Sequence, residues 1–464
     1  MSPQKFLLVS FPIPSHLNPA LQLARALLRA GAQVTLSTGE SARDRLSASQ
    51  LPRGLEFVAF PDGSRDQSPP TKEIVTNDNI ENSMANIEQL SVGFLRDLIV
   101  SEADEGCPFT CIIYTAVAPW IADLAREMGI PSVMIWLQPA ALLDMYYYYF
   151  NGYSDEITNA CNDRTGLVQL PSLPPFSACD IPTFITPTNN FPILRKMMHM
   201  QLEVLMKETN PKVLVNTFDA LEEAPLKAID KLTMVGIGPL LPLAFTGGDS
   251  TSNPSDSSDE YFQWLNTKPE ASVVYVSFGS ISVLQKEQME EMARGLLKMG
   301  RPFLWVMRKD KGAATAPQEE ADRVSCWEEL QEKGKIIPWC SQYEVLSHPS
   351  VGCFLTHCGW NSTLESLACG VPMVAFPQWT DQLTNAKLIE DVWKTGVRVK
   401  PNEETRIVEG DEIMRCIEKV MDSGESGEEI RRNAGKWKVL AREAVEEGGS
   451  SHRNIASFLE EIAA

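Results

Sequence analysis

Three features common in other protein classes are missing from this chain of 464 residues. No apolar run reaches 18 residues, so no segment is predicted to cross a membrane as a helix. The first residues contain one Lys and an apolar stretch that Pro12 and Pro14 interrupt, which is unlike a secretory signal. Basic residues are scarce: 41 Lys and Arg against 61 Asp and Glu give a net charge of −20. That charge argues against nucleic acid or anionic membranes as partners.

Paired metal-binding or redox cysteines are also missing. The ten cysteines show no paired CxxC spacing of a zinc site or a redox dithiol. We expect them to be reduced thiols, and therefore expect a cytoplasmic protein. Neither half of the chain carries GxGxxG after its first strand, which argues against a nucleotide-sugar epimerase or dehydrogenase.

Strand and helix patterns alternate in the first half of the chain. Residues 6–10 predict a buried strand, and Asn18-Pro19 predicts a helix N-cap followed by Pro at the first helical position. An apolar face then continues to Gly31, and a second strand is expected at 34–37. This is a βαβ unit. Further strands of this half are expected at 111–114, 132–137 and 213–216.

The same alternation restarts after a segment rich in Pro, Gly, Ser and Asp at 240–260, which reads as a linker. A strand at 273–278 leads to a Gly279-Ser280 turn and then to a helix in which Ser282 and Gln285 have capping-box spacing. Other strands are expected at 303–307, 351–356 and 371–376, and a surface loop without assigned chemistry at 309–322. Length and pattern together predict two doubly wound α/β domains that bind ligands at the carboxyl ends of their strands.

The most informative segment is 339–382, WCSQYEVLSHPSVGCFLTHCGWNSTLESLACGVPMVAFPQWTDQ. Its apolar strand ends in the turn 357–361, and a helix follows in which Ser362 and Glu365 have capping-box spacing. The N–H groups and positive dipole end of such a helix suit a diphosphate, here with His357 beside it.

Several residues of this segment allow two interpretations. Glu365 either caps its helix or binds ribose hydroxyls, and both roles are compatible. Asp381-Gln382 either places a charge at the start of a helix running to Trp393 or binds the hydroxyls of a hexose. Trp339 is either a core aromatic or a platform for a base. His348 lies inside the segment without an evident partner, and we interpret it as structural.

From its first Trp to its last Gln, the segment resembles the signature box of the plant secondary-product UDP-dependent glycosyltransferases of family 1. The resemblance covers nearly the whole chain, more loosely in the N-terminal half. It implies a GT-B fold, with two Rossmann-like domains facing across a cleft. The implied divisions are an acceptor-binding domain at 1–240, a linker at 241–260, a UDP-sugar-binding domain at 261–445 and a helix at 446–464 that crosses back to the first domain. The implied UDP-sugar-binding residues are Ser280, Trp339, Cys340, Gln342, His357, Trp360, Asn361, Ser362, Glu365, Asp381 and Gln382.

The resemblance also bears on the donor. Trp360 and a final Gln382, where galactose users of the family tend to carry His, favour UDP-glucose as co-substrate. No Asp-x-Asp pair of the metal-dependent sugar-nucleotide transferases is present, so we expect neither a metal nor another cofactor.

His16 is the predicted catalytic base. A lone His is more often structural, but His16-Leu17-Asn18-Pro19 matches the family's His-x-Asn-Pro pattern just past the first strand. It would take the acceptor's proton while the acceptor oxygen displaces UDP with inversion. Many relatives orient this His with an Asp where the chain has Thr115, whose neutral hydroxyl cannot offset an imidazolium charge. An ionised carboxylic acid needs no base, and a phenol needs less help than an alcohol.

The acceptor is less well specified. Ile13, Gln138, Phe191 and Trp379 are candidates for an apolar pocket. The run 146–150, YYYYF, either joins that pocket or forms a helix packing face. It resembles most closely the subgroup acting on flavonoids, anthocyanins and small carboxylic acids. We expect a monomeric glucosyltransferase that uses small-molecule partners, with a UDP-sugar-binding regulatory protein of little turnover as the alternative.

Overall fold

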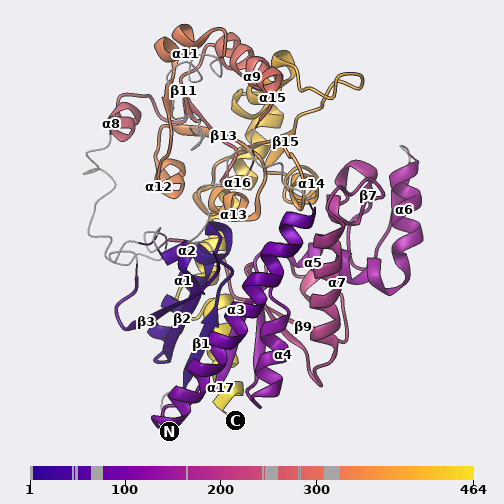
Figure 1. Cartoon of the computed structure of the whole chain (residues 1–464). Helices are drawn as coiled ribbons and strands as arrows, with labels where there is room; N and C mark the ends of the chain where they lie inside the picture. Colours follow the sequence, from indigo (N-terminus) through magenta and orange to yellow (C-terminus); the bar gives the residue numbers. More distant parts are fainter. Residues whose placement is uncertain are drawn as a thin grey trace. The chain divides into compact units, whose positions relative to one another are not determined.

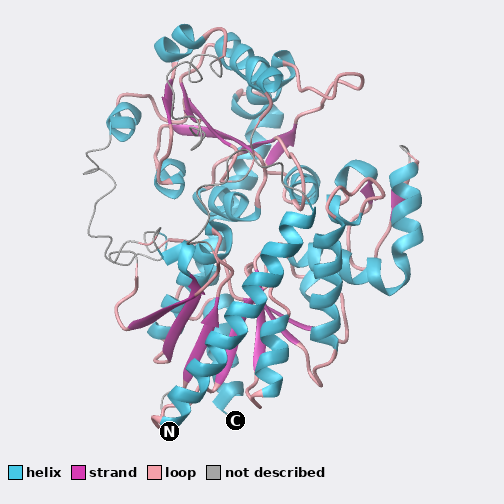
Figure 2. Ribbon diagram, in the orientation of Figure 1, coloured by secondary structure: helices cyan, strands magenta, loops and turns pink. Residues whose placement is uncertain are grey.

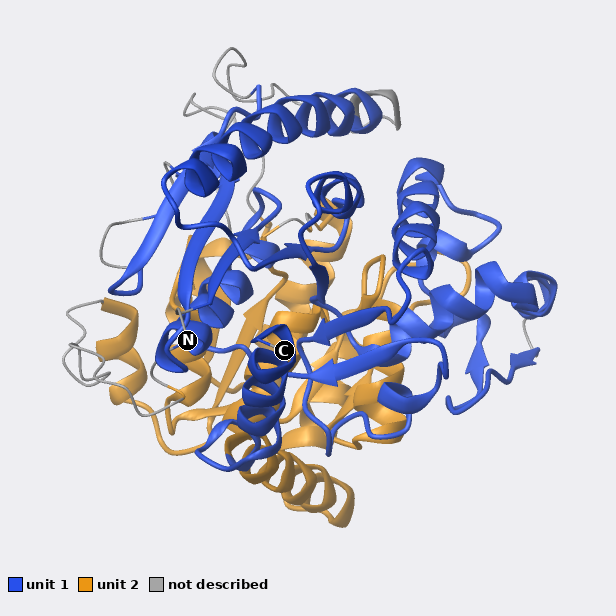
Figure 3. Ribbon diagram, turned by 90° about the horizontal axis from the view of Figure 1, so that it is seen from below, with its two compact units in different colours: residues 1–242, 443–464 blue, residues 243–442 orange. Residues whose placement is uncertain are grey.

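The computed structural model describes residues 4–43, 46, 51–63, 77–163, 166–242, 245, 260–280, 282, 284–307 and 324–463. The chain divides into two compact units (Figure 3), residues 1–242 with 443–464, and residues 243–442. Most of the segment expected to be a linker, and all of the expected surface loop, lie outside the described residues. No helix among the described residues is long and apolar enough to cross a membrane.

Unit 1 is built on a seven-stranded sheet in the order β3-β2-β1-β4-β5-β8-β9, and every neighbouring pair is parallel. Figure 2 shows helices against this sheet, which agrees with its mostly buried strands. The strands are β1 (Lys5–Val9), β2 (Gln33–Gly39), β3 (Leu55–Phe60), β4 (Cys111–Thr115), β5 (Ser132–Trp136), β8 (Lys212–Val215) and β9 (Thr233–Gly236). The longer helices are α1 (Pro14–Arg29), α3 (Asn77–Asp104), α4 (Trp120–Glu127), α5 (Ala140–Tyr148), α6 (Ser154–Asn162), α7 (Pro192–Met206) and α17 (Ser450–Ala463).

Strand β1 lies at the point where the strand order of unit 1 changes direction. It pairs with β2 on one side and with β4 on the other. The connections leaving β1 and β4 therefore diverge, which is where doubly wound sheets bind ligands. The turn into α1 follows β1, and Thr115 is the last residue of β4.

Helix α1 begins earlier than the sequence indicates. Pro14, not Pro19, occupies its first turn, Ile13 is the N-cap residue, and Pro19 lies inside the helix. Pro14 suits the start because its fixed φ is already helical and its missing N–H would have no partner there. The predicted start at Asn18-Pro19 is therefore wrong. As a result His16 belongs to the first turn of α1 rather than to the preceding loop.

The C-terminal helix α17 belongs to unit 1 (Figure 1). Phe458 and Leu459 are buried in the same apolar cluster as Phe6, and Ile455 and Ile462 pack against it. These four residues form the apolar face of the helix. Polar contacts reinforce the docking: Ser451 Oγ donates to the Gly238 carbonyl at 2.5 Å, and Gln4 Nε2 donates to the Leu459 carbonyl at 2.7 Å.

Unit 2 carries a six-stranded parallel sheet in the order β12-β11-β10-β13-β14-β15. Its central strand β10 is followed by a turn at Gly279-Ser280 and pairs with β13. The strands are β10 (Val273–Ser277), β11 (Phe303–Val306), β12 (Lys335–Ile337), β13 (Val351–Thr356), β14 (Met373–Ala375) and β15 (Gly396–Arg398). The helices are α8 (Glu260–Asn266), α9 (Lys286–Met299), α11 (Trp327–Lys333), α12 (Gln342–Ser347), α13 (Trp360–Cys369), α14 (Gln382–Lys387), α15 (Gly410–Met421) and α16 (Glu425–Val445).

The predicted capping box at the start of α9 is wrong. The N-cap residue is Gln285, without a side-chain cap, so Ser282 lies in the preceding loop. The predicted helical face is nevertheless present, since Met292 and Leu296 are buried and Met289 packs against the same apolar cluster.

The docking of α17 yields a test of unit 1 stability. Phe458→Ala removes a buried ring whose centroid lies 6.0 Å from that of Phe6, so we expect a loss of about 3–5 kcal/mol in the free energy of unfolding of unit 1. Glu460→Ala, on the exposed side of the same helix, should change it by less than about 0.5 kcal/mol. Urea unfolding checks both. A loss below about 1 kcal/mol for Phe458→Ala would show that α17 contributes little to the core.

Candidate active site

His357 lies where the carboxyl ends of β10 and β13 meet. It follows β13 directly and is 8% exposed. Its ring is packed between two glycines: a Cβ added at Gly279 or at Gly359 would stand only 2.5 Å from His357 Nε2. Gly279 also has φ +72°, a conformation that residues with a side chain rarely adopt. Both glycines are therefore needed to leave room for the imidazole.

Helix α13 starts beside this imidazole. Gly359 is its N-cap residue and has no side chain with which to cap the helix. The predicted capping box is wrong, because Ser362 and Glu365 lie within the helix rather than at its boundary. A helix N-terminus without a side-chain cap, next to an imidazole, has the features of an anion-binding site. The turn into the helix is anchored by Asn385 Nδ2, which donates to the Cys358 carbonyl at 2.8 Å.

Gln342, the first residue of α12, and Glu365 of α13 form a half-buried polar pair. Gln342 Nε2 donates to Glu365 Oε2 at 2.5 Å and to Ser362 Oγ at 2.8 Å. Burial raises the pKa of Glu365 to about 7, and the bond from Gln342 opposes that shift. The capping alternative for Glu365 is excluded, and its carboxyl group is held at a defined place by the Gln342 amide.

Trp339 and Cys340 are adjacent in sequence but differ in environment. Trp339 is 65% exposed, so its interpretation as a core aromatic is wrong and its ring face is available for stacking. The Cys340 side chain is buried, and its Sγ lies 3.3 Å from Tyr275 Oη. Burial raises the pKa of the Cys340 thiol to about 11. Its side chain therefore packs behind the site rather than offering a reactive thiolate.

Asp381 and Gln382 are buried and hold their own loop in place. Asp381 is the N-cap residue of α14, and its carboxylate accepts from Thr380 Oγ1 at 2.6 Å and from Asn385 Nδ2 at 2.8 Å. Gln382 Oε1 accepts the backbone N–H groups of Gln378 and Trp379 at 2.9 and 3.3 Å. With its oxygen engaged in this way, the Gln382 amide is fixed with its NH₂ group directed elsewhere. The helix-terminus interpretation of Asp381 is confirmed, and binding of a hexose stays a prediction.

Other predicted residues take different places. Ser280 is exposed, and Asn361 is half-buried at the start of α13. The Trp360 ring is buried against Trp393, with centroids 5.8 Å apart, so it supports the helix from inside. His348 is structural as expected, because its two ring nitrogens contact Ser350 Oγ and Asn266 Oδ1 at 2.8 and 3.0 Å.

Ser282 is a polar residue of this region that the sequence reasoning did not assign to the site. Its Oγ is buried, and among the described residues it has no hydrogen-bond partner. It stands three residues after Gly279, near the end of β10. The sequence signal that could have placed it in the site was a hydroxyl shortly after the Gly279-Ser280 turn. The sequence pattern predicted a helix cap for this hydroxyl instead.

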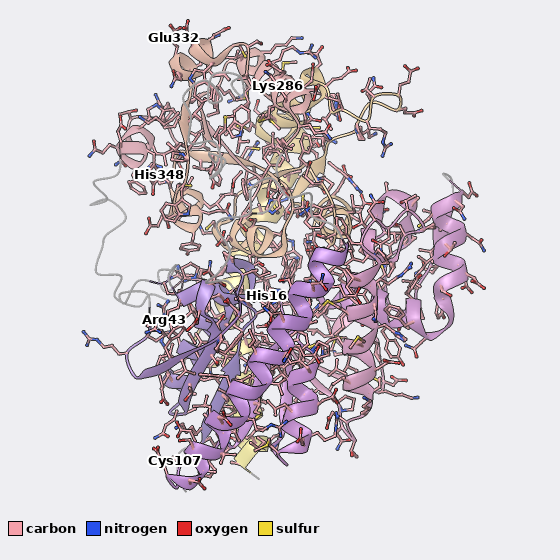
Figure 4. All side chains as sticks on the ribbon, in the orientation of Figure 1. His16, Arg43, Cys107, Lys286, Glu332 and His348 are labelled. Carbon is pink, nitrogen blue, oxygen red and sulfur yellow. The ribbon has the colours of Figure 1, made fainter. Side chains whose placement is uncertain are left out.

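In unit 1, His16 is the third residue of α1 (Figure 4). Its Nδ1 atom is buried and has no hydrogen-bond partner among the described residues. Burial lowers the pKa of His16 to about 4, and the positive end of α1 acts in the same direction. The imidazole is therefore neutral at pH 7, the form that can accept a proton.

Thr115 is fully buried, and its Oγ1 accepts the Phe11 backbone N–H at 2.9 Å. This bond ties the end of β4 to the chain leaving β1, just before the turn that carries His16. Among the described residues no hydrogen bond joins Thr115 to His16. A direct role of the hydroxyl at the imidazole stays a prediction, while its role in fixing the Phe11 backbone is observed.

The candidate acceptor residues Ile13, Gln138 and Phe191 are half-buried in unit 1, and Trp379 is half-buried in unit 2. Within the tyrosine run, Tyr146 is 1% exposed and meets Trp136 edge-on, with centroids 6.2 Å apart. Tyr148 is also buried and donates to the Ala228 carbonyl at 2.9 Å. These two tyrosines form a packing face. The other three residues of the run are half-buried.

The family model described as "UDP-glucoronosyl and UDP-glucosyl transferase" matches residues 190–431, slightly more than half of the chain. The chain belongs to this family of UDP-dependent glycosyltransferases. The two parallel sheets are those of its GT-B fold, and the segment 339–382 lies within the matched residues. The relatives are catalysts, so the interpretation as a regulatory protein of little turnover is not favoured.

Two similar glycosyltransferases span almost the same length as this chain. One is a chloroplastic crocetin glucosyltransferase of Gardenia jasminoides, 54% identical over 98% of this chain and 96% of the relative. Another is a phloretin 4'-O-glucosyltransferase of Malus domestica, 51% identical over 100% and 98%. Among solved structures, Os79 of O. sativa in complex with UDP has a TM-score of 0.81 and 30% identity, covering 98% of this chain and all of that one.

The packing of His357 between Gly279 and Gly359 yields a test of the donor site. Gly359→Ala puts a methyl group against His357 Nε2 without a backbone penalty, since Gly359 has φ −60°. Displacing the imidazole removes a hydrogen bond to a charged group, so UDP affinity should fall about 10- to 100-fold in calorimetry. Gly435→Ala in α16 meets nothing within 4 Å and is the matched control. Unchanged UDP binding in Gly359→Ala would remove His357 from the diphosphate site.

Proposed function

We propose that this glycosyltransferase transfers glucose from UDP-glucose, with inversion and without a metal ion, to a phenolic hydroxyl or carboxyl group of a small apolar plant metabolite. The observation that supports it most is His357, packed between Gly279 and Gly359 at the start of a helix whose N-cap residue is glycine. Transfer creates negative charge on the departing UDP, and helix N–H groups with an imidazole donor stabilise such charge.

We propose that the remaining donor-site residues each bind a different part of the nucleotide sugar. The exposed Trp339 stacks on the uracil, and Glu365, held by Gln342, accepts ribose hydroxyls. Ser280 and Ser282 lie in the loop that follows β10 and offer hydroxyl donors to the diphosphate. Asp381 and the NH₂ group of Gln382 bind the glucose hydroxyls.

His16 is proposed to remove the proton from a phenolic acceptor. The acceptor oxygen then forms a bond to the anomeric carbon as the bond from that carbon to the UDP oxygen breaks. A carboxylate acceptor attacks directly, since it has no proton to give at pH 7. The crocetin and phloretin relatives represent these two acceptor chemistries, a carboxylic acid and a phenol.

Three subsidiary expectations belong to this proposal. The protein works as a monomer, requires no cofactor besides the donor, and resides in the cytoplasm. The ten cysteines are all free thiols in the structure, which supports a reducing compartment. Acceptor contacts from Ile13, Gln138, Phe191 and Trp379 are part of the same proposal.

A direct test measures donor preference and metal dependence together. The enzyme is incubated with UDP-glucose, UDP-galactose or UDP-glucuronate and a panel of phenols and aromatic acids, with and without EDTA, and products are identified by mass spectrometry. We expect glucosides, formed at the same rate in EDTA. A preference for another donor contradicts the glucose assignment. Loss of turnover in EDTA that magnesium restores contradicts the metal-free mechanism.

Replacing His16 separates the two acceptor chemistries. His16→Ala should reduce kcat/KM for a phenol about 10²-fold or more, the range of general base catalysis, and should change transfer to a carboxylate far less. Because the pKa of His16 is about 4, the wild-type phenol reaction should not lose its base until the pH falls toward about 4. In Thr115→Asp this loss of activity at low pH should begin at a higher pH, since a nearby negative charge raises the pKa of the imidazole.

The carboxylate acceptor is the internal control for this series, since its reaction has no proton to remove. Steady-state kinetics of wild type, His16→Ala and Thr115→Asp on one phenol and one acid provide the comparison. Equal losses on both acceptors in His16→Ala would mean that His16 positions substrate rather than accepting a proton.

A further inference from the structure

Asp144 is a buried acid in the middle of α5. The residue is 0% exposed, and neither of its carboxyl oxygens has a hydrogen-bond partner among the residues that the structure describes. An ionised carboxylate in such a place carries a large desolvation cost. In practice a buried acid without a partner avoids that cost by keeping its proton.

A second buried acid, Glu222, lies close enough for its charge to act on Asp144. Glu222 is 3% exposed but well partnered: its two carboxyl oxygens accept the Ala140 and Ala141 backbone N–H groups at 2.9 and 3.1 Å. It thereby caps α5, whose own N-cap residue Pro139 makes no side-chain cap. Asp144 follows Ala140 and Ala141 by four and three residues, which places it on the same side of the helix.

We propose that, of the two buried acids Asp144 and Glu222, only Asp144 carries a proton at neutral pH, and that this proton keeps α5 in position. The contacts of the two acids indicate which of them carries the proton. Burial raises the pKa of Glu222, but the two backbone N–H groups that it accepts at a helix N-terminus oppose this shift and favour its ionised form. Asp144 accepts nothing from the described residues and faces the Glu222 charge, so both burial and that charge raise its pKa.

Among the described residues, the elements packed around α5 bring no compensating cation to Asp144. On α5 itself the Tyr148 phenol interacts with Asp144, and its surroundings include the Tyr147 phenol, the Tyr153 phenol of the π-helical turn at 149–153, and Asp230. The short helix 225–227 contributes Lys227, which is exposed and paired with Glu223 at 3.0 Å. On α7 the charged side chains are exposed or half-buried. Within the described part of the chain, Glu222 is the one charge that acts on Asp144.

The position of α5 matters because the turn before it carries Gln138, a candidate acceptor residue. Three contacts fix the helix: Trp136 Nε1 donates to the Pro139 carbonyl at 2.8 Å, Glu222 accepts the first N–H groups, and Tyr148 donates to the Ala228 carbonyl. Ionising Asp144 would place a second negative charge beside Glu222, at the centre of these contacts. We therefore expect α5 to open more readily as the pH rises.

The sign of this effect follows from proton linkage. The folded protein holds the Asp144 proton more tightly than the opened segment does. Opening therefore releases a proton, and the opening constant of α5 increases with pH by up to tenfold per unit until the folded pKa is passed. Asn at position 144 mimics the protonated acid and has no proton to lose, so its opening constant should not depend on pH through this group.

The first experiment is native-state hydrogen exchange of the α5 peptide between about pH 6 and about pH 9, corrected for intrinsic exchange rates. Wild type, Asp144→Asn and the control Asp155→Asn, an exposed acid of α6, are compared. The ratio of opening constants between wild type and Asp144→Asn should rise by up to tenfold per pH unit, while Asp155→Asn follows wild type. Because this test uses the slope, a constant offset caused by the Asn amide does not affect it. Parallel profiles for wild type and Asp144→Asn would overturn the proposal.

The second experiment observes the proton itself by infrared spectroscopy. Wild type and Asp155→Asn at about pD 8 should show the carbonyl band of a protonated carboxyl group that Asp144→Asn lacks. Identical bands in all three proteins would overturn the assignment. Should Asp144→Asn fail to fold, Glu222→Gln provides the test. Removing the Glu222 charge should shift the pH at which the carbonyl band of protonated Asp144 disappears. An unchanged pH would refute the proposal that the Glu222 charge helps to keep Asp144 protonated.

Discussion

The chemistry of this protein is confined to strand ends because both sheets are parallel and buried. Strands such as β1, β4, β10 and β13 are almost wholly enclosed, so most of their side chains are apolar. Polar groups that must meet a ligand can then occur only where the strands stop and the chain turns into a helix. His16 follows β1, Thr115 ends β4 and His357 follows β13. Each half offers its ligand the same two elements, an imidazole and a helix N-terminus.

The two imidazoles nevertheless have different proposed roles. His16 is half-buried in the first turn of its helix, and its lowered pKa keeps it neutral. His357 is clamped between two glycines beside a helix that begins with Gly359, where an anion is favoured. The same residue type thus suits proton acceptance in one unit and charge stabilisation in the other, and the local packing makes the distinction. Glu365 illustrates the same point, since its carboxyl acquires a pKa of about 7 from burial alongside Gln342.

Apolar runs and turn residues were sufficient to predict the inner strands of both sheets, because buried parallel strands are short and nearly continuous in their hydrophobicity. The edge strands β3, β9, β12 and β15 were not predicted. Helix starts were harder. Ser282-Gln285 and Ser362-Glu365 both have capping-box spacing, but the N-cap residues are Gln285 and Gly359, without a side-chain cap. Spacing alone cannot show whether a serine lies before a helix or inside it. Interactions between distant residues, such as the effect of the Glu222 charge on Asp144 or the hydrogen bond between Phe11 and Thr115, have no local signature at all.

The C-terminal helix α17 has a consequence for the order in which the two halves fold during synthesis. Phe458 and Leu459 complete the apolar cluster around Phe6, although more than 400 residues of chain separate them. All of unit 2, residues 243–442, is synthesised before that helix exists. On the ribosome, then, the half made first is the half completed last, and its open core must be kept from aggregating until the final residues emerge. A nascent chain stalled before residue 450 would expose the apolar surface that α17 normally covers.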